Sequence, residues 1–439
     1  MPTVPSLPSG SHTSDANFRV VQLPPENLET CASCNVFKPK VRKNCSCGQV
    51  TYCSDECQKD GWNVHKPSCG KFPTDQIDLQ ALYPLLACLV EKSHSHEIKP
   101  RHKALTKTVV SNPTPGNPPV RFSDGWEAAP VIFQRRPSRP LSDPFCPDAR
   151  WWPEGATPRI REKLYDRIRR EGYVLPILTA VCIALLAEVY TSSSSHEESS
   201  KRRLRLRYST GPVADFGICS GKARVTTQDR LGYLDMDSKS ETHGQDPEDH
   251  YWIYFRTTRG EDLFLDCAMF TFSMNLVVQP GLCTPRSYGP SFSESVPAFF
   301  LEREIRHDAP SLHTERARRS VLRDAALQGA VQRSGTKAGF TAKDDDVFVA
   351  FMRALARREI TATERQLVAA LTRDHALTLR GVLRDEEWKR YPTRPETAVI
   401  ADPVELVDYD ERMKAHADAL EKKKKTEKKM GIKPRPKHS

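Results

Sequence analysis

The residues best suited to chemistry in this 439-residue chain are thiols and one imidazole gathered in a single short segment. Seven of the 13 cysteines lie between residues 31 and 69. Thiolate and imidazole are ligands that Zn²⁺ prefers, and eight of them are enough for two tetrahedral ions. Such clustering predicts metal ligation in a reducing compartment and not a disulfide framework. In chain order the eight candidate ligands are Cys31, Cys34, Cys45, Cys47, Cys53, Cys57, His65 and Cys69.

Local signals predict the elements that would position these ligands. Gly48 follows Cys47 and would ease a tight turn there. Ser54 is a good helix N-cap, and the acidic residues at 55 and 56 suit the positive end of a first helical turn. We therefore expect a short helix over residues 54–66. A segment of this size cannot bury enough apolar surface to fold alone. Bound metal must therefore supply folding free energy.

The cysteine segment resembles the MYND finger. The resemblance rests on the run Tyr52-Cys53-Ser54, then Cys57-Gln58, Trp62, His65 and Cys69, and it covers residues 31–69 only. In that family the ligand pairs interleave in a cross-braced arrangement. The resemblance thus implies one zinc site from the first and third pairs and another from the second and fourth. One departure is that a single residue separates Cys45 from Cys47, where the family usually has two. The implied sites are Cys31, Cys34, Cys53 and Cys57, and Cys45, Cys47, His65 and Cys69.

The same resemblance implies a binding role. With all eight positions filled by protein, neither ion has a free position for a substrate, so we expect two structural zinc ions and no metal catalysis. MYND relatives bind short Pro-containing peptides in a groove beside the helix, which implies that Gln58 and Trp62 line that groove. The alternative for Trp62 is a core role, packing the helix onto the zinc loops. The expected partner is a protein with a Pro-containing peptide, and the expected setting is a regulatory protein.

An enzyme is the competing hypothesis. The Asn-His-Ser-Cys segment of SET-domain methyltransferases, which also carry this finger, is absent from the sequence. His250 begins one strand-like run and Asp266 ends the next, a placement similar to that in transglutaminase-like cysteine hydrolases. Cys182 would be the nucleophile, activated by the His and oriented by the Asp. Its position inside an apolar run favours a buried structural thiol, and an ordinary hairpin explains the other two residues equally well.

Composition and pattern predict an α+β fold: a small cross-braced two-zinc finger, a mixed α+β body and a helical C-terminal region, with disordered termini. This arrangement loosely resembles fungal MYND-domain proteins, a likeness that implies no activity. The expected divisions are a disordered segment (1–27), the finger (28–72), a helix plus a Pro-rich linker (73–150), the α+β body (151–313), the helical region (314–400) and a basic tail (401–439).

Periodicity predicts the main elements. We expect an amphipathic helix over 77–92, with Pro84 inside it, and mostly loops over 93–150. A charged helix over 160–170 precedes a buried helix or strand over 174–190. Strands follow, two of them flanking a hairpin turn at 258–261. Thr361 and Glu364 form a capping box for a later helix.

The net charge of +10 is concentrated at one end, since residues 421–439 hold nine Lys or Arg and two Glu. The tail could be an import signal, a nonspecific nucleic-acid contact or a solubilising end. It lacks aromatic residues for base stacking. Residues 1–27 have no apolar signal region, and no apolar run reaches the length of a membrane span. We therefore expect a protein of the nucleus or cytoplasm without a membrane segment.

Overall fold

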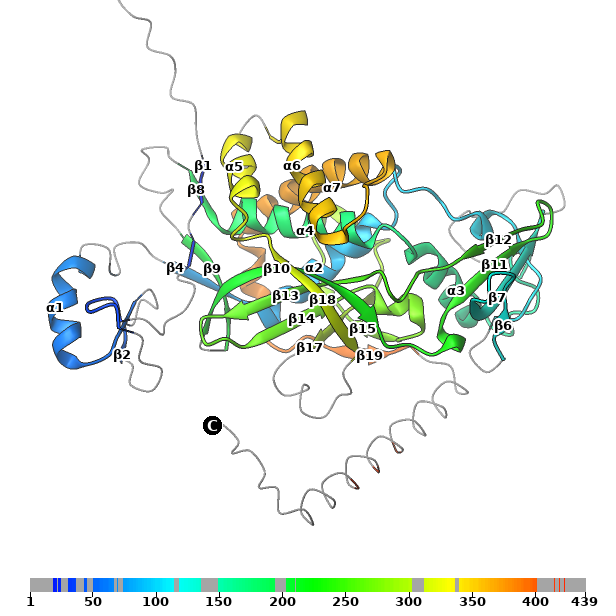
Figure 1. Cartoon of the computed structure of the whole chain (residues 1–439), viewed down its shortest axis with the longest axis horizontal. Coiled ribbons are helices and arrows are strands. Elements are labelled where there is room, and N and C mark those ends of the chain that lie inside the picture. The colour runs from blue at the N-terminus through cyan, green and yellow to red at the C-terminus, as the bar shows by residue number, and fades with distance from the viewer. Residues whose placement is uncertain are drawn as a thin grey trace, which may run out of the picture.

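The computed structural model confirms the predicted combination of a finger, an α+β body and a helical region toward the C-terminus (Figure 1). The predicted domain boundaries stay predictions. The structure describes residues 19–21, 23–24, 31–36, 43–45, 50–66, 69, 74–113, 118–135, 149–193, 203–209, 211–301, 312–335 and 339–400, with the single residues 414, 418 and 422.

A mixed sheet forms the centre of the body. Its strand order is β17-β14-β13-β10-β9-β4, and β18 also pairs with β10. The predicted hairpin is confirmed, since β13 and β14 pair in antiparallel and the amide of Thr257 donates to the carbonyl of Glu261. The strands are β4 (Thr74–Asp78), β9 (Arg203–Tyr208), β10 (Gly211–Ala223), β13 (His250–Thr257), β14 (Asp262–Asp266), β17 (Phe299–Leu301) and β18 (His313–Ser320).

Helices cover one face of this sheet. The apolar run after residue 173 is a helix, α4 (Val174–Val189), and its side chains are almost all buried. Pro176 is tolerated because it lies in the first helical turn, where the amide has no helical acceptor. In Figure 1, α4 lies between the sheet and α5 (Ala325–Ser334), α6 (Ala342–Ala356) and α7 (Ala362–Arg384). The predicted Thr361–Glu364 capping box is present at the start of α7.

The helix α2 (Leu79–Ser93) corrects a prediction. Pro84 lies inside it, as the sequence suggested, but the helix is buried on nearly all sides and is not amphipathic. It packs against α4 and shares the main apolar core with it and with the sheet. A helix enclosed in this way has no solvent face for polar residues to mark.

The long strand β10 was not predicted from the sequence. Glycines at 217 and 221 weaken its strand pattern, and the structure shows why they are there. A Cβ at Gly217 would lie 2.1 Å from the carbonyl oxygen of Arg319, and one at Gly221 would lie 2.1 Å from that of Thr314. Both carbonyls belong to β18, so the glycines permit its close approach to β10.

A second sheet corrects the expectation of loops over residues 93–150. Strand β7 (Glu127–Gln134) pairs in parallel with β11 (Leu231–Asp235), which lies about a hundred residues later. Because its partner is so distant, local pattern gave no sign of the pairing. The helix α3 (Pro158–Arg170), predicted from the sequence, packs beside it. The other strands of this sheet are β5 (Thr108–Val109), β6 (Val120–Arg121) and β12 (Ser240–His243). A further small sheet contains β15 (Leu276–Val278), β16 (Val296–Pro297) and β19 (Thr397–Val399).

The finger is inserted between two strands that pair with the body. Before it, β1 (Arg19–Val21) pairs in antiparallel with β8 (Thr191–Ser193), and after it β4 pairs in parallel with β9. The Arg19 guanidinium is buried and donates to the carbonyl of Ala187 over 2.7 Å. The sequence did not indicate the strand at Arg19–Val21, because partners far along the chain supply its hydrogen bonds.

Among the described residues, no single helix is both long and apolar enough for a membrane span. The helices α3 and α4 meet that test only as a pair, and they are bent by 76° relative to each other.

Candidate metal centre

The helix α1 (Asp55–His65) positions two of the candidate ligands. Ser54 is its N-cap, as predicted, and its hydroxyl oxygen accepts a hydrogen bond from the amide of Cys57 over 3.2 Å. Asp55 and Glu56 occupy the first turn. Because the cap fixes where the helix begins, Cys57 falls in the first turn and His65 at the last position.

The structure brings together the four sulfur atoms assigned to the first zinc site. All four lie within 4.8 Å of one another. Cys53 Sγ is 3.6 Å from Cys34 Sγ and 3.5 Å from Cys57 Sγ. Tetrahedral Zn²⁺ with its usual Zn–S bonds holds sulfur atoms roughly 3.8 Å apart, so these separations fit such an ion with little movement. The set is Cys31, Cys34, Cys53 and Cys57.

The electrostatics of this cluster favour a bound cation. Burial raises the pKa of Cys31, but backbone hydrogen bonds from Cys34, Cys53 and Ser33 lower it by more, to about 6. Hydrogen bonding with the sulfurs of Cys57 and Cys34 raises the pKa of Cys53 to about 12. Adjacent thiolates repel, so one ionises and its neighbour resists. A divalent cation between them removes that conflict, which is the setting in which a thiol is deprotonated outright.

A second cluster contains three of the four ligands assigned to the other site. Cys45 Sγ lies 3.4 Å from Cys69 Sγ and 3.3 Å from His65 Nε2. The three side chains are within 4.8 Å of one another, and His65 is buried. Cys47 lies outside the described residues. The two clusters draw on alternating parts of the segment, the arrangement that the resemblance implied.

Tyr52 is the centre of the finger's small core, a role that the sequence did not reveal. Its side chain is fully buried, in β3 (Thr51–Tyr52), which pairs with β2 (Lys43–Asn44). A Cβ at Gly61 would lie 2.6 Å from Tyr52 Cε1, so the glycine allows α1 to pack directly on this ring.

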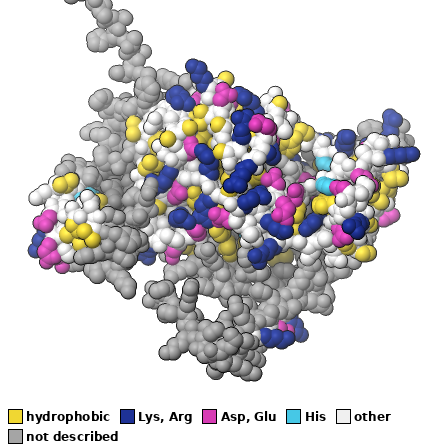
Figure 2. All heavy atoms as spheres, in the orientation of Figure 1, with side chains coloured by type: hydrophobic (Ala, Val, Ile, Leu, Met, Phe, Trp, Pro, Cys, Tyr) yellow, Lys and Arg dark blue, Asp and Glu magenta, His cyan; other side chains and the backbone are white. Residues whose placement is uncertain are grey.

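Trp62 lies at the surface of the finger. It is 37% exposed, and its ring lies in a T-shaped arrangement with that of His65, at 5.9 Å between centroids. Gln58 is half-buried and stands one turn earlier. Residues four apart share a helix face, so Gln58 and Trp62 line one side of α1. Figure 2 shows hydrophobic side chains exposed on the finger beside acidic ones.

The structure does not bring Cys182 to the other two residues of the hydrolase hypothesis. His250 and Asp266 do meet, with His250 Nε2 2.5 Å from Asp266 Oδ2. Side chains alternate between the faces of a strand. Tyr251 and Ile253 point into the main core with Cys182, so His250 points to the opposite face. Burial also raises the pKa of the Cys182 thiol well above its usual value. This arrangement does not support a cysteine nucleophile.

The residue that does join the pair is His313, which sequence reasoning missed. Its Nε2 lies 2.7 Å from Asp266 Oδ2. It begins β18, 47 residues after the aspartate, and no local motif links the two.

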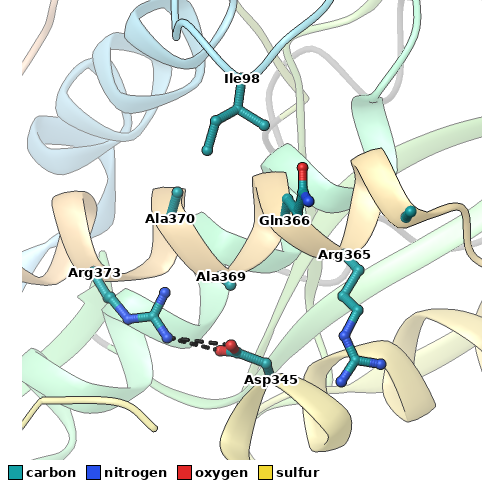
Figure 3. Close-up of a pocket in the computed structure, with 8 residues that line it drawn as sticks. Ile98, Asp345, Arg365, Gln366, Ala369, Ala370 and Arg373 are labelled. Atoms are coloured by element: carbon teal, nitrogen blue, oxygen red, sulfur yellow. Dashed lines mark hydrogen bonds and ion pairs between the residues drawn. The ribbon is translucent and has the colours of Figure 1, made fainter. Parts of the chain in front are cut away.

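A shallow pocket of about 440 Å³ lies along α7, shown in Figure 3. Its charged groups are already paired, since Arg373 contacts Asp345 at 3.0 Å and Arg365 contacts Asp346. The pocket therefore offers no free charge for a ligand. Its lining residues are Ile98, Asp345, Ala362, Arg365, Gln366, Ala369, Ala370 and Arg373.

Comparison with known families identifies one segment of the chain. Residues 31–69 match the family described as MYND finger. No curated protein and no solved structure is found to match the chain. With the two Cys/His clusters, this match establishes a zinc-binding finger of a type that generally mediates protein–protein interaction.

Proposed function

We propose that the finger binds two structural Zn²⁺ ions and docks a Pro-containing peptide of a partner protein in a regulatory role. The first ion is held by Cys31, Cys34, Cys53 and Cys57. The second is held by Cys45, Cys47, His65 and Cys69. Each ion has four protein ligands, so the ions stabilise the finger and recognition falls to its surface.

The exposure of Trp62 beside Gln58 carries this proposal. Tyr52 fills the finger's core, which leaves the indole of Trp62 accessible on α1. Pro-rich peptides already adopt an extended helix when free, so they lose little conformational entropy on binding. Aromatic-lined grooves bind such peptides. An indole offers a rigid apolar face for a proline ring, and the Gln58 amide can hydrogen-bond to the peptide backbone.

Val64 provides a matched control on the same helix. Its side chain is 84% exposed, and its position two residues from Trp62 turns it toward the other side of α1. We expect Trp62→Ala to weaken binding of a Pro-containing peptide to the full-length chain by about 30-fold or more, the loss typical of a central Trp. Val64→Ala should bind as the wild type does. Selection of the peptide from a library, followed by calorimetry, measures both. Equal effects of the two substitutions, or no zinc-dependent peptide, would overturn the proposal.

The number of ions is tested separately. Cys57→Ser and Cys69→Ser should each reduce the zinc content of the full-length chain, and the double variant should contain two ions fewer than the wild type. Mass spectrometry of the native protein counts them. A loss of one ion in the double variant would show a single site.

We also propose that the protein works in the nucleus or cytoplasm. The support is the reducing compartment that free thiols require and the Lys-rich tail. Comparing the distribution of the full-length chain with that of a chain lacking residues 421–439 tests whether the tail acts in import. Any contact of the tail with nucleic acid should be nonspecific and should weaken steeply with salt.

A further inference from the structure

Three buried polar side chains meet on the face of the main sheet opposite α4. His250 begins β13, Asp266 ends β14 and His313 begins β18, so all three stand at the same end of the sheet. Asp266 Oδ2 lies 2.5 Å from His250 Nε2 and 2.7 Å from His313 Nε2. The side chains of His250 and Asp266 are fully buried, and that of His313 is 7% exposed. Three potential metal-ligand atoms therefore converge within 4.8 Å, close to the surface.

The surrounding structure fixes the orientation of each group. Asp266 Oδ1 accepts hydrogen bonds from the amides of Ala268 and Met269, at 2.8 and 3.2 Å, which directs Oδ2 toward the imidazoles. Trp252 stacks on His313 at 4.5 Å and on His250 at 5.9 Å between ring centroids. Hydrogen bonds thus orient the carboxylate and ring packing orients the imidazoles, so the three ligand atoms are held in place before any ion binds.

The donor set of the cluster suits a cation. One carboxylate oxygen and two imidazole nitrogens are common ligands of divalent transition metals, and the three atoms converge where the side chains are almost completely removed from water.

Binding of an ion would require the three ligand atoms to move apart, because they now lie at hydrogen-bond distance. For a tetrahedral ion at about 2.0–2.2 Å from each ligand, the nitrogen and oxygen atoms must separate to roughly 3.4 Å. That shift is somewhat under about 1 Å for each pair and requires rotation of the side chains.

We propose that His250 Nε2, Asp266 Oδ2 and His313 Nε2 bind one divalent transition-metal ion. Two imidazoles and a carboxylate suit Zn²⁺, Fe²⁺ or Mn²⁺ and do not suit Ca²⁺ or Mg²⁺, which prefer oxygen ligands alone. Three protein ligands leave further coordination positions for water or a small anionic ligand. This site is independent of the finger, whose ligands lie between residues 31 and 69.

The test is a count of metal ions bound by the full-length chain. Metal-free wild-type protein is given two equivalents of zinc, which the thiolate-rich finger takes up, and is then titrated with Co²⁺; bound metal is measured by mass spectrometry and absorbance. We expect one ion beyond those of the finger, without the sulfur-to-cobalt charge-transfer band that thiolate ligands give. His313→Gln and Asp266→Asn should each weaken binding of this ion more than about 100-fold, because even outer partners of metal ligands change affinity by 10- to 100-fold. If Asp266→Asn fails to fold, His313→Gln alone tests the proposal, because His313 lies nearest the surface and its substitution disturbs the core least.

Two controls separate this result from other effects. His375→Gln replaces a buried histidine outside the cluster and should retain the additional ion. Cys57→Ser disrupts the finger and should also retain it, so failure of the finger proposal and failure of this one are distinguishable. Absence of the additional ion in the wild type, or its undiminished binding by His313→Gln, would overturn the proposal and leave a hydrogen-bonded His–Asp–His cluster.

Discussion

Arg170 Nε lies 2.8 Å from Glu91 Oε2, and the side chains of both residues are almost completely buried. The neighbouring Arg169 also contacts this carboxylate. Burial raises the pKa of Glu91, but the two guanidinium groups lower it by more, so the net pKa lies well below its usual value. Glu91 belongs to α2 and the arginines to α3, so the contact joins the main core to the second sheet's core.

Removing this carboxylate charge should be costly. Glu91→Gln removes the buried counterion of Arg170 and of the partly buried Arg169, and we expect the free energy of unfolding to fall by about 3–5 kcal/mol. Asp166 pairs with the same two arginines but is 37% exposed. Asp166→Asn should therefore cost under about 1 kcal/mol. Chemical denaturation of both variants measures the difference, and similar losses would contradict the importance of burial.

The same contact predicts acid sensitivity. The folded-state pKa of Glu91 is depressed, so its contribution to stability is complete above the unfolded-state value of about 4.5 and is lost as pH falls below it. The wild type should lose stability relative to Glu91→Gln between about pH 5 and pH 3. Denaturation curves across that range provide the measurement, and parallel curves for the two proteins would refute the assignment.

Close packing of β18 on β10 makes Gly217 sensitive to a single methyl group. A Cβ there would lie 2.1 Å from the carbonyl oxygen of Arg319, so Gly217→Ala should lower the free energy of unfolding by more than about 2 kcal/mol. Gly381 lies in α7, and a Cβ there would meet no atom within 4 Å. Gly381→Ala should be neutral or stabilise by up to about 1 kcal/mol. Thermal unfolding of the pair tests this prediction, and equal effects would count against it.

Disrupting the finger should leave the body folded. Its small core, around Tyr52, is separate from the apolar cores of the body. In Cys57→Ser we expect trypsin to cleave α1 after the exposed Lys59 much faster than in the wild type, because the helix loses its metal support. The unfolding midpoint of the body should stay unchanged. Slow cleavage at Lys59, or a clear shift of that midpoint, would contradict this separation.

His375 should contribute to loss of stability at mildly acidic pH. Burial lowers its pKa to about 3, and its Nε2 lies 2.9 Å from Ser93 Oγ. Between pH 6.5 and pH 3 the unfolded chain binds a proton there that the folded chain does not, so stability falls with pH. By pH 5 the resulting loss in the free energy of unfolding is about 2 kcal/mol. His375→Gln should remove that part of the slope between pH 7 and pH 5. Ser93→Ala, which leaves the ring buried, should retain it, and an unchanged slope in His375→Gln would refute the assignment.

Features set by residues close together in sequence were predictable. The Cys and His spacing indicated the finger, Ser54 indicated the start of α1, and Thr361 with Glu364 indicated the start of α7. Each depends on contacts within one or two turns of chain. The length and apolar character of residues 174–189 were likewise enough to predict a buried element.

Features that depend on distant partners were not predictable. Half of the residues in β18 are charged, and pairs such as Arg318 with Asp262 conceal its strand character. His313 reaches Asp266 only because β18 lies against β10, which itself needed glycine at positions where sequence patterns disfavour a strand. The exposure of Trp62 followed from Tyr52 filling the finger's core, which spacing alone could not show.

The pairing of β1 with β8 and of β4 with β9 has a further consequence. Since β8 and β9 are consecutive strands, both ends of the finger return to neighbouring parts of the body (Figure 1). The finger is thus an insertion whose two ends are both held by the body. The entropic cost of closing such a loop changes only slowly with the length of the loop. A short flexible linker could replace it, and another small domain could be transplanted into its place, while Arg19 and β4 keep their contacts with the body.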